Sequence, residues 1–238
     1  MSRSWRQWRA WLATRLKRLP CAHAAQLAET DFIIRSYLMG VNYILFRVGG
    51  EENFISNNLL RYLVQDYLQS AISIVVLAVE GLLNVAKREL RFLIESSIKQ
   101  CFIQQKNYET SIQEKILLFD KELSSQGISI KQNLDLGLLP EAMRDQFQDE
   151  VGRVYGLTSN YVHLTPSQLL ERITSIDAGR TAGRESAAGI KTMNALLSRG
   201  LACSLVLLFH SVPSWVAGDW LVEEDGSTVS YGQKLVTA

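Results

Sequence analysis

The chain of 238 residues contains little cysteine, histidine or proline. Its three cysteines, Cys21, Cys101 and Cys203, are far apart, which excludes a local disulfide framework and a Cys-x-x-Cys zinc or redox motif. Its three histidines have no cysteine or acidic partners at metal-ligand spacing. We therefore expect no metal ion and no cofactor, and the unpaired thiols favour a reducing, cytoplasmic setting.

Long apolar runs are lacking as well. Residues 71–79 and 201–209 fall well short of the ~20 residues that a membrane span needs, so we expect no transmembrane segment. Phosphate-binding loops, dinucleotide-binding fingerprints and nucleophile elbows are also missing from the sequence. Residues 178–189 contain three glycines but no lysine, and this composition predicts a connector.

Apolar side chains make up 47% of the chain and recur at the three- and four-residue steps of a helix. The sequence therefore predicts an all-α fold, a multi-helix bundle with long helices. Helices are predicted over residues 24–48, 53–105, 112–123, 140–162, from 166 onward, and 190–210. The chain divides into a basic amphipathic arm (1–22), a helical bundle domain (23–213) and a small C-terminal hairpin or tail (214–238), with Trp220-Leu221-Val222 on one side of the hairpin.

Glycine and proline mark the expected helix boundaries. The dipeptide at 49–50 predicts a turn between two helices, and Pro140 predicts a helix start. Residues 53–105 would span about 80 Å as one helix, so we expect a break, with Gly81 as a candidate. Residues 165–168 form a capping box. The stripes expected to be buried comprise Met143, Phe147, Val151, Val154, Thr158 and Val162 in one helix and Leu169, Leu170 and Ile173 in the next.

The arm differs in charge from the rest of the chain. The first 28 residues hold six basic side chains and no acidic one, whereas the remainder holds 19 basic and 24 acidic side chains. Its apolar residues recur with helical spacing, at Trp5, Trp8, Leu12, Leu16 and Leu19. Such a segment can bind an anionic membrane surface or RNA, dock on the bundle of its own chain, or serve as a mitochondrial transit peptide. The residues expected to bind a surface are Arg3, Trp5, Arg6, Trp8, Arg9, Arg15, Lys17 and Arg18.

Two polar lines follow the edges of predicted buried stripes. Tyr155, Ser159 and His163 lie about 40°, 80° and 120° around their helix from the buried stripe. Arg91 and Glu95 lie on the flank of another stripe, in the 53–105 segment. Side chains in these positions are half covered and can meet a neighbouring helix, and if they are covered we expect them to satisfy one another.

These two lines carry a resemblance to known proteins. Residues 86–95 contain an Arg-x-x-x-Glu pattern, and residues 155–163 contain Tyr-x-x-x-Ser-x-x-x-His. Over roughly residues 55–175 the chain resembles an uncharacterised group of bacterial helical proteins with these two helices, which are similar to the HEPN (higher eukaryotes and prokaryotes nucleotide-binding) superfamily. The resemblance implies a homodimer or a partner protein, and a role in a bacterial stress or phage-defence system.

HEPN ribonucleases place an arginine four to six residues before a histidine on one helix. Here Leu157, Thr158 and Ser159 occupy those positions, so only Arg91, from another helix, can take the role of the arginine. We therefore favour a non-catalytic HEPN-like interaction module, with a metal-independent ribonuclease and an arm-mediated membrane or nucleic-acid-binding protein as alternatives. The candidate catalytic residues are Arg91, Glu95, Tyr155, Ser159, Asn160 and His163. The purely structural alternative is an i,i+4 pair between Arg91 and Glu95, with His163 capping a helix.

Overall fold

The computed structural model describes residues 14, 20–123, 128–162, 165–177 and 185–221. These residues form nine α-helices and one 3-10 helix, with no strand among them, which confirms the predicted all-α bundle. The elements are α2 (Cys21–Val48), α3 (Glu52–Asn57), α4 (Leu59–Val79), α5 (Leu83–Lys106), α6 (Ile112–Leu123), η1 (Ile128–Asn133), α7 (Glu141–Ser159), α8 (Pro166–Asp177), α9 (Ala187–Phe209) and α10 (Ser214–Leu221).

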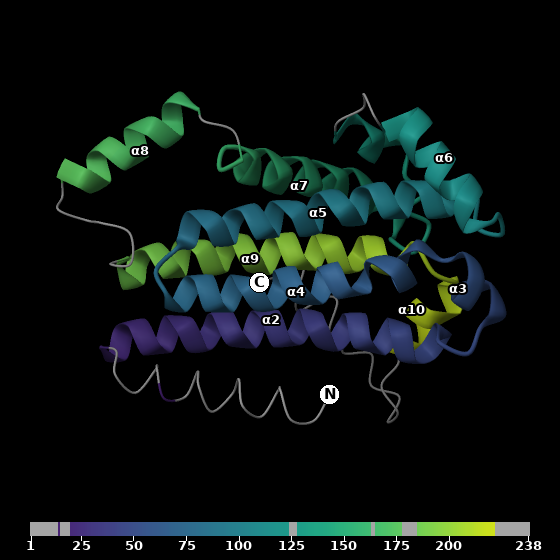
Figure 1. The fold of residues 1–238 in the computed structure, drawn as a ribbon, viewed down its shortest axis with the longest axis horizontal. Coiled ribbons are helices and arrows are strands. Elements are labelled where there is room, and N and C mark those ends of the chain that lie inside the picture. The colour runs from purple at the N-terminus through teal and green to yellow at the C-terminus, as the bar shows by residue number, and fades with distance from the viewer. Residues whose placement is uncertain (1–13, 15–19, 124–127, 163–164, 178–184, 222–238) are drawn as a thin grey trace.

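Four long helices form the centre of the bundle (Figure 1). Each of α2, α4, α5 and α9 packs on two of the others, so that they close a ring in the order α2, α4, α5, α9. Helix α7 lies over the seam between α5 and α9, and α10 packs at the ends of α2 and α9. Helix α2 thus has one side in the core and the opposite side at the edge of the bundle.

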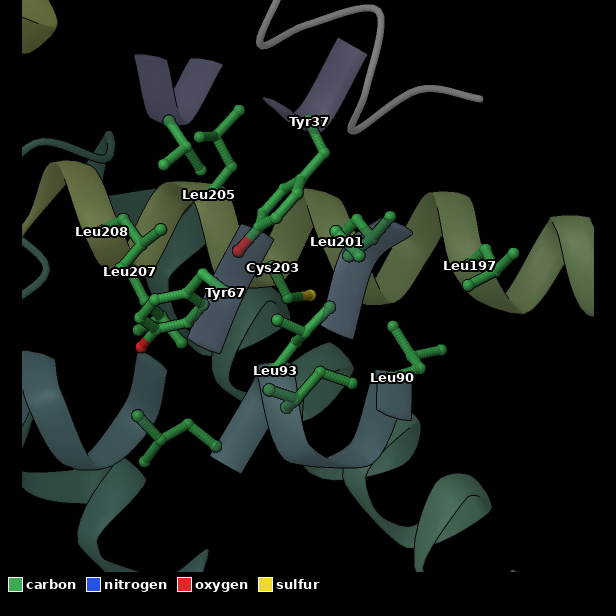
Figure 2. Packing of buried hydrophobic residues seen from close by; sticks show 14 of the residues in the cluster. Tyr37, Tyr67, Leu90, Leu93, Leu197, Leu201, Cys203, Leu205, Leu207 and Leu208 are labelled. Carbon is green, nitrogen blue, oxygen red and sulfur yellow. The ribbon is translucent and has the colours of Figure 1, made fainter. Parts of the chain in front are cut away.

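The core is a continuous set of leucine, isoleucine and valine side chains supplied by all four central helices, with Tyr37 and Tyr67 among them (Figure 2). Three helices approach one another closely around Gly200. A Cβ atom at Gly200 would lie 2.9 Å from Leu90 and 3.1 Å from both Ile94 and Val154. Because those three residues belong to α5 and α7, glycine at this position lets α5, α7 and α9 pack against one another.

Several hydroxyl and amide groups buried between the helices are paired. Ser204 on α9 contacts the Tyr37 hydroxyl on α2 at 3.1 Å and accepts a hydrogen bond from Ser97 on α5 at 2.8 Å. Thr30 on α2 donates to the Asn194 side chain on α9 at 2.6 Å. These bonds offset the cost of burying polar atoms and fix the register of α2 and α5 against α9.

Most predicted helix boundaries are confirmed. The turn at 49–50 and the 112–123 helix are where the sequence predicts them, and the 140–162 helix begins at Glu141. The break at Gly81 is confirmed: its φ of 70° lies in the left-handed region that glycine adopts without strain. A second break at Asn58 was not predicted. The Asn58 side chain accepts a hydrogen bond from the backbone N–H of Leu60 and so caps the start of α4.

Three expectations need correction. Helix α7 ends at Ser159, so Val162 is 48% exposed and does not extend the buried stripe. On α8, Leu169, Leu170 and Ile173 are all exposed, because this helix stands away from the bundle (Figure 1). The C-terminal region begins with a helix, α10, which includes residues 220 and 221 of the expected hairpin. The rest of that region, and the arm apart from Thr14, lie outside the described residues.

Helices α4 and α9 are long and apolar enough to cross a membrane by length and composition alone. Their apolar windows are 33% and 67% buried, respectively. The hydropathy of α9 is accounted for by its central position, because it packs on α2, α5, α7 and α10.

Candidate functional site

The two predicted polar lines meet where α5 packs against α7. The pairs Arg88 with Tyr161 and Arg91 with Ser159 show that the two segments run antiparallel. Arg91, Glu95, Tyr155 and Ser159 therefore come together, and we refer to these four residues as the α5–α7 cluster. Tyr155 and Ser159 are one helical turn apart on α7, as Arg91 and Glu95 are on α5, so each line faces the other.

Arg91 is the centre of the cluster and is only 8% exposed. Its Nε–H donates to the Ser159 hydroxyl at 3.0 Å, and its Nη1 lies 2.7 Å from the Glu95 carboxylate. The guanidinium carbon lies 3.2 Å from the centre of the Tyr155 ring. Ser159 in turn donates to the Tyr155 backbone carbonyl at 2.8 Å. The guanidinium is thus held by a carboxylate, a hydroxyl and an aromatic face.

Glu95 has two cationic partners. Its other oxygen lies 2.5 Å from the Lys99 ammonium, one turn further along α5. Burial alone would raise the pKa of Glu95, but the hydrogen bond from Lys99 and the charge of Arg91 outweigh it and hold the pKa below its ordinary value. Glu95 is therefore ionised at neutral pH, and the ammonium, carboxylate and guanidinium form one line along α5.

Lys87 and Arg88 extend this line toward the end of α7, and sequence reasoning missed them. Arg88 Nε donates to the Tyr161 carbonyl at 2.5 Å, and the Lys87 ammonium lies 4.0 Å from the centre of the Tyr161 ring. Both residues bind just beyond the C-terminus of α7, where exposed carbonyls favour cations. Their spacing of three and four residues from Arg91 was the available sequence signal.

The other two candidate residues are not placed in the cluster. Asn160 is the C-cap residue of α7, and its backbone N–H donates to the Thr158 carbonyl. His163 lies outside the described residues, as do the eight arm residues expected to bind a surface. The structure thus describes five of the six candidate catalytic residues and brings four of them into contact.

Burial shifts the pKa of two cysteines and one histidine elsewhere in the described part of the chain. Burial raises the pKa of the Cys101 and Cys203 thiols, which keeps them protonated and unreactive. Burial lowers the pKa of His210, although its backbone hydrogen bonds oppose this shift. Within the described ranges, no three His, Cys, Asp or Glu side chains gather closely enough to hold a metal ion.

Comparison of the chain with protein-family models, with curated proteins and with solved structures gave no match. The HEPN-like character inferred from residues 86–95 and 155–163 therefore stays a prediction.

Proposed function

We propose that this chain is a non-catalytic, HEPN-like helical interaction module. The observation that carries the proposal is the engagement of Arg91. The ribonuclease alternative needs this guanidinium to hold a scissile phosphate, and a phosphate is bound best by free, paired N–H donors. In the α5–α7 cluster the Nε–H of Arg91 donates to Ser159, its Nη1 lies beside the Glu95 carboxylate, and its flat face covers Tyr155.

The charge of the cluster supports the same conclusion. Any phosphate that approached Arg91 would also meet the ionised Glu95 carboxylate, 2.7 Å from the guanidinium. Releasing Arg91 toward RNA would break its hydrogen bond to Ser159 and its contacts with Glu95 and the Tyr155 ring, and a hydrogen bond from a charged donor is worth about 1.5–3 kcal/mol. The arrangement is therefore suited to joining α5 to α7 and not to binding a substrate.

Exposed apolar surface supports an interaction role. Helix α8 presents Leu169, Leu170, Ile173 and Ile176, which are 47–70% exposed. In Figure 1 this helix stands apart from the four central helices, and its apolar side is not packed on them. An amphipathic helix with an uncovered apolar face is a common recognition element for another protein, including a second copy of the same chain.

The test for catalysis is incubation of the purified full chain with single-stranded RNA in the presence of EDTA. We expect no cleavage above that of a His163→Ala preparation made in parallel, because the Arg91 guanidinium is already engaged by Glu95 and Ser159. Cleavage that is lost in both His163→Ala and Arg91→Lys, while the far-UV circular dichroism spectrum is unchanged, would contradict the proposal and establish the ribonuclease alternative.

The test for interaction is the mass of the full chain in solution, measured by light scattering at micromolar concentration. We expect twice the 26.8 kDa of one chain. Ile173→Glu, in the middle of the apolar face of α8, should return the single-chain mass, because a carboxylate buried in an interface is costly. Thr174→Glu is the matched control, since Thr174 is exposed and lies about 100° around α8 from Ile173. A wild-type mass of one chain would contradict self-association.

A further inference from the structure

Helix α2 exposes an apolar stripe on the side that faces away from the core. Phe32, Met39 and Phe46 are 66%, 63% and 81% exposed, and Phe46 is the most exposed large apolar side chain among the described residues. They are spaced by seven residues, which is two helical turns, so they form a row along one side of the helix. The opposite side of α2 packs on α9, α4 and α10, and this row lies outside those contacts.

The segment that precedes α2 has a matching pattern. The apolar residues of the arm, residues 1–19, recur at the three- and four-residue steps that give a helix one apolar side: Trp5, Trp8, Leu12, Leu16 and Leu19. The arm joins α2 directly through Pro20, which lies in an extended conformation (φ −53°, ψ 143°) and ends any continuous helix between the two. A helix that folds back at this point must run antiparallel to α2.

We propose that residues 1–19 fold back as a helix on the outer side of α2, with their tryptophans covering Phe32 and Met39. Length decides which part of the row is covered. An arm of 19 residues spans about 28 Å as a helix. Measured from Cys21, Phe32 lies about 16 Å, Met39 about 27 Å and Phe46 about 38 Å along α2. The arm therefore reaches the first two residues of the row and leaves Phe46 uncovered.

Covalent attachment favours the arm over a second copy or a lipid surface as the occupant. Because the arm is tethered next to the row, its effective concentration there is in the millimolar range or higher. Docking also gives each side of the arm helix a suitable environment. When the apolar side faces α2, Arg3, Arg6 and Lys17 lie on the opposite side of the arm helix and stay in water. The tryptophans are then withheld from a bilayer, and the docked arm presents a basic outer surface.

Trypsin tests the docking in the full chain, because it cuts after the arginines of the arm only when the arm is released. Cleavage at Arg6 and Arg9 is followed by intact-mass spectrometry. We expect Phe32→Gln and Trp8→Gln each to speed this cleavage about tenfold, and the double variant to add little, because both remove the same contact. Phe46→Gln is the matched control, another exposed phenylalanine on the same row but beyond the reach of the arm, and should change the rate less than about twofold.

Three results would overturn the proposal. The first is the same cleavage rate in the wild type, Phe32→Gln and Phe46→Gln. The second is a fall in solution mass on Phe32→Gln, which would assign the row to a second copy of the chain. The third is an arm that resists trypsin only after addition of phosphatidylglycerol vesicles, which would assign its tryptophans to a lipid surface. Because Phe32 is mostly exposed, its variant is expected to fold, and an unchanged far-UV spectrum verifies this.

Discussion

Replacing Arg91 by methionine tests whether the α5–α7 cluster holds the two helices together. Methionine keeps the apolar stem and removes the guanidinium. The hydrogen bond to Ser159 involves a charged donor and is worth about 1.5–3 kcal/mol, and the contact with the Tyr155 ring adds about 0.5–2 kcal/mol. Glu95 keeps Lys99 as a partner, so its carboxylate is not left unpaired. We therefore expect the free energy of unfolding to fall by about 2–5 kcal/mol.

Urea denaturation of a double-mutant cycle isolates the contact between the helices. Ser159→Ala should cost about 1–3 kcal/mol, because it leaves the buried Arg91 Nε–H without an acceptor. Combined with Arg91→Met it should show a coupling energy above about 1 kcal/mol. Arg153→Met is the matched control: Arg153 is 65% exposed and lies 3.8 Å from Glu150, so its loss should cost less than about 0.5 kcal/mol. A coupling energy between Arg91 and Ser159 no larger than the cost of Arg153→Met would refute the structural role of the cluster.

Three further predictions concern stability. Gly200→Ala should lower the free energy of unfolding by about 1–3 kcal/mol in urea, because its Cβ would press on Leu90 of α5. Gly81→Ala should lower the free energy of unfolding by about 1–2 kcal/mol, because an alanine is strained at the positive φ of this position. An unchanged free energy of unfolding would place the break between α4 and α5 at another residue. Burial lowers the pKa of Lys115 from 10.5 to about 8. The unfolded chain therefore binds more protons between these values, and stability should rise with pH across this window; Lys115→Met, measured in parallel, should remove that rise.

The local structure of the chain was largely readable from its sequence. Helical periodicity predicted the 112–123 helix, the capping box at 165–168 predicted the start of α8, and a lone glycine in a long apolar segment predicted the break at Gly81. These features depend on backbone conformation and on neighbours within one or two turns. The break at Asn58 was missed because asparagine carries a weaker signal than glycine or proline, although its side chain caps α4 in the structure.

Helical angles also predicted which polar residues would lie beside the core, but not what they would contact. The helical rotation of 100° per residue was enough to place Arg91 and Ser159 at the edges of the apolar stripes of their helices. That they contact each other depends on α5 and α7 being antiparallel neighbours, and on Gly200 letting α9 pack close to both. The ion pair of Arg91 with Glu95, by contrast, is an i,i+4 contact that the sequence predicts without any tertiary information.

The sequence by itself determined that this chain is all-α, where most of its helices begin and end, and which side of each central helix is apolar. Only the tertiary structure decided that Arg91 is engaged by Glu95, Ser159 and Tyr155, and that the apolar side of α8 and the outer apolar row of α2 face away from the helical core. The physical reason is the distance along the chain over which each kind of interaction acts. Helix formation and amphipathicity arise from contacts within a few residues, whereas burial and pairing depend on side chains that are brought together from distant parts of the chain.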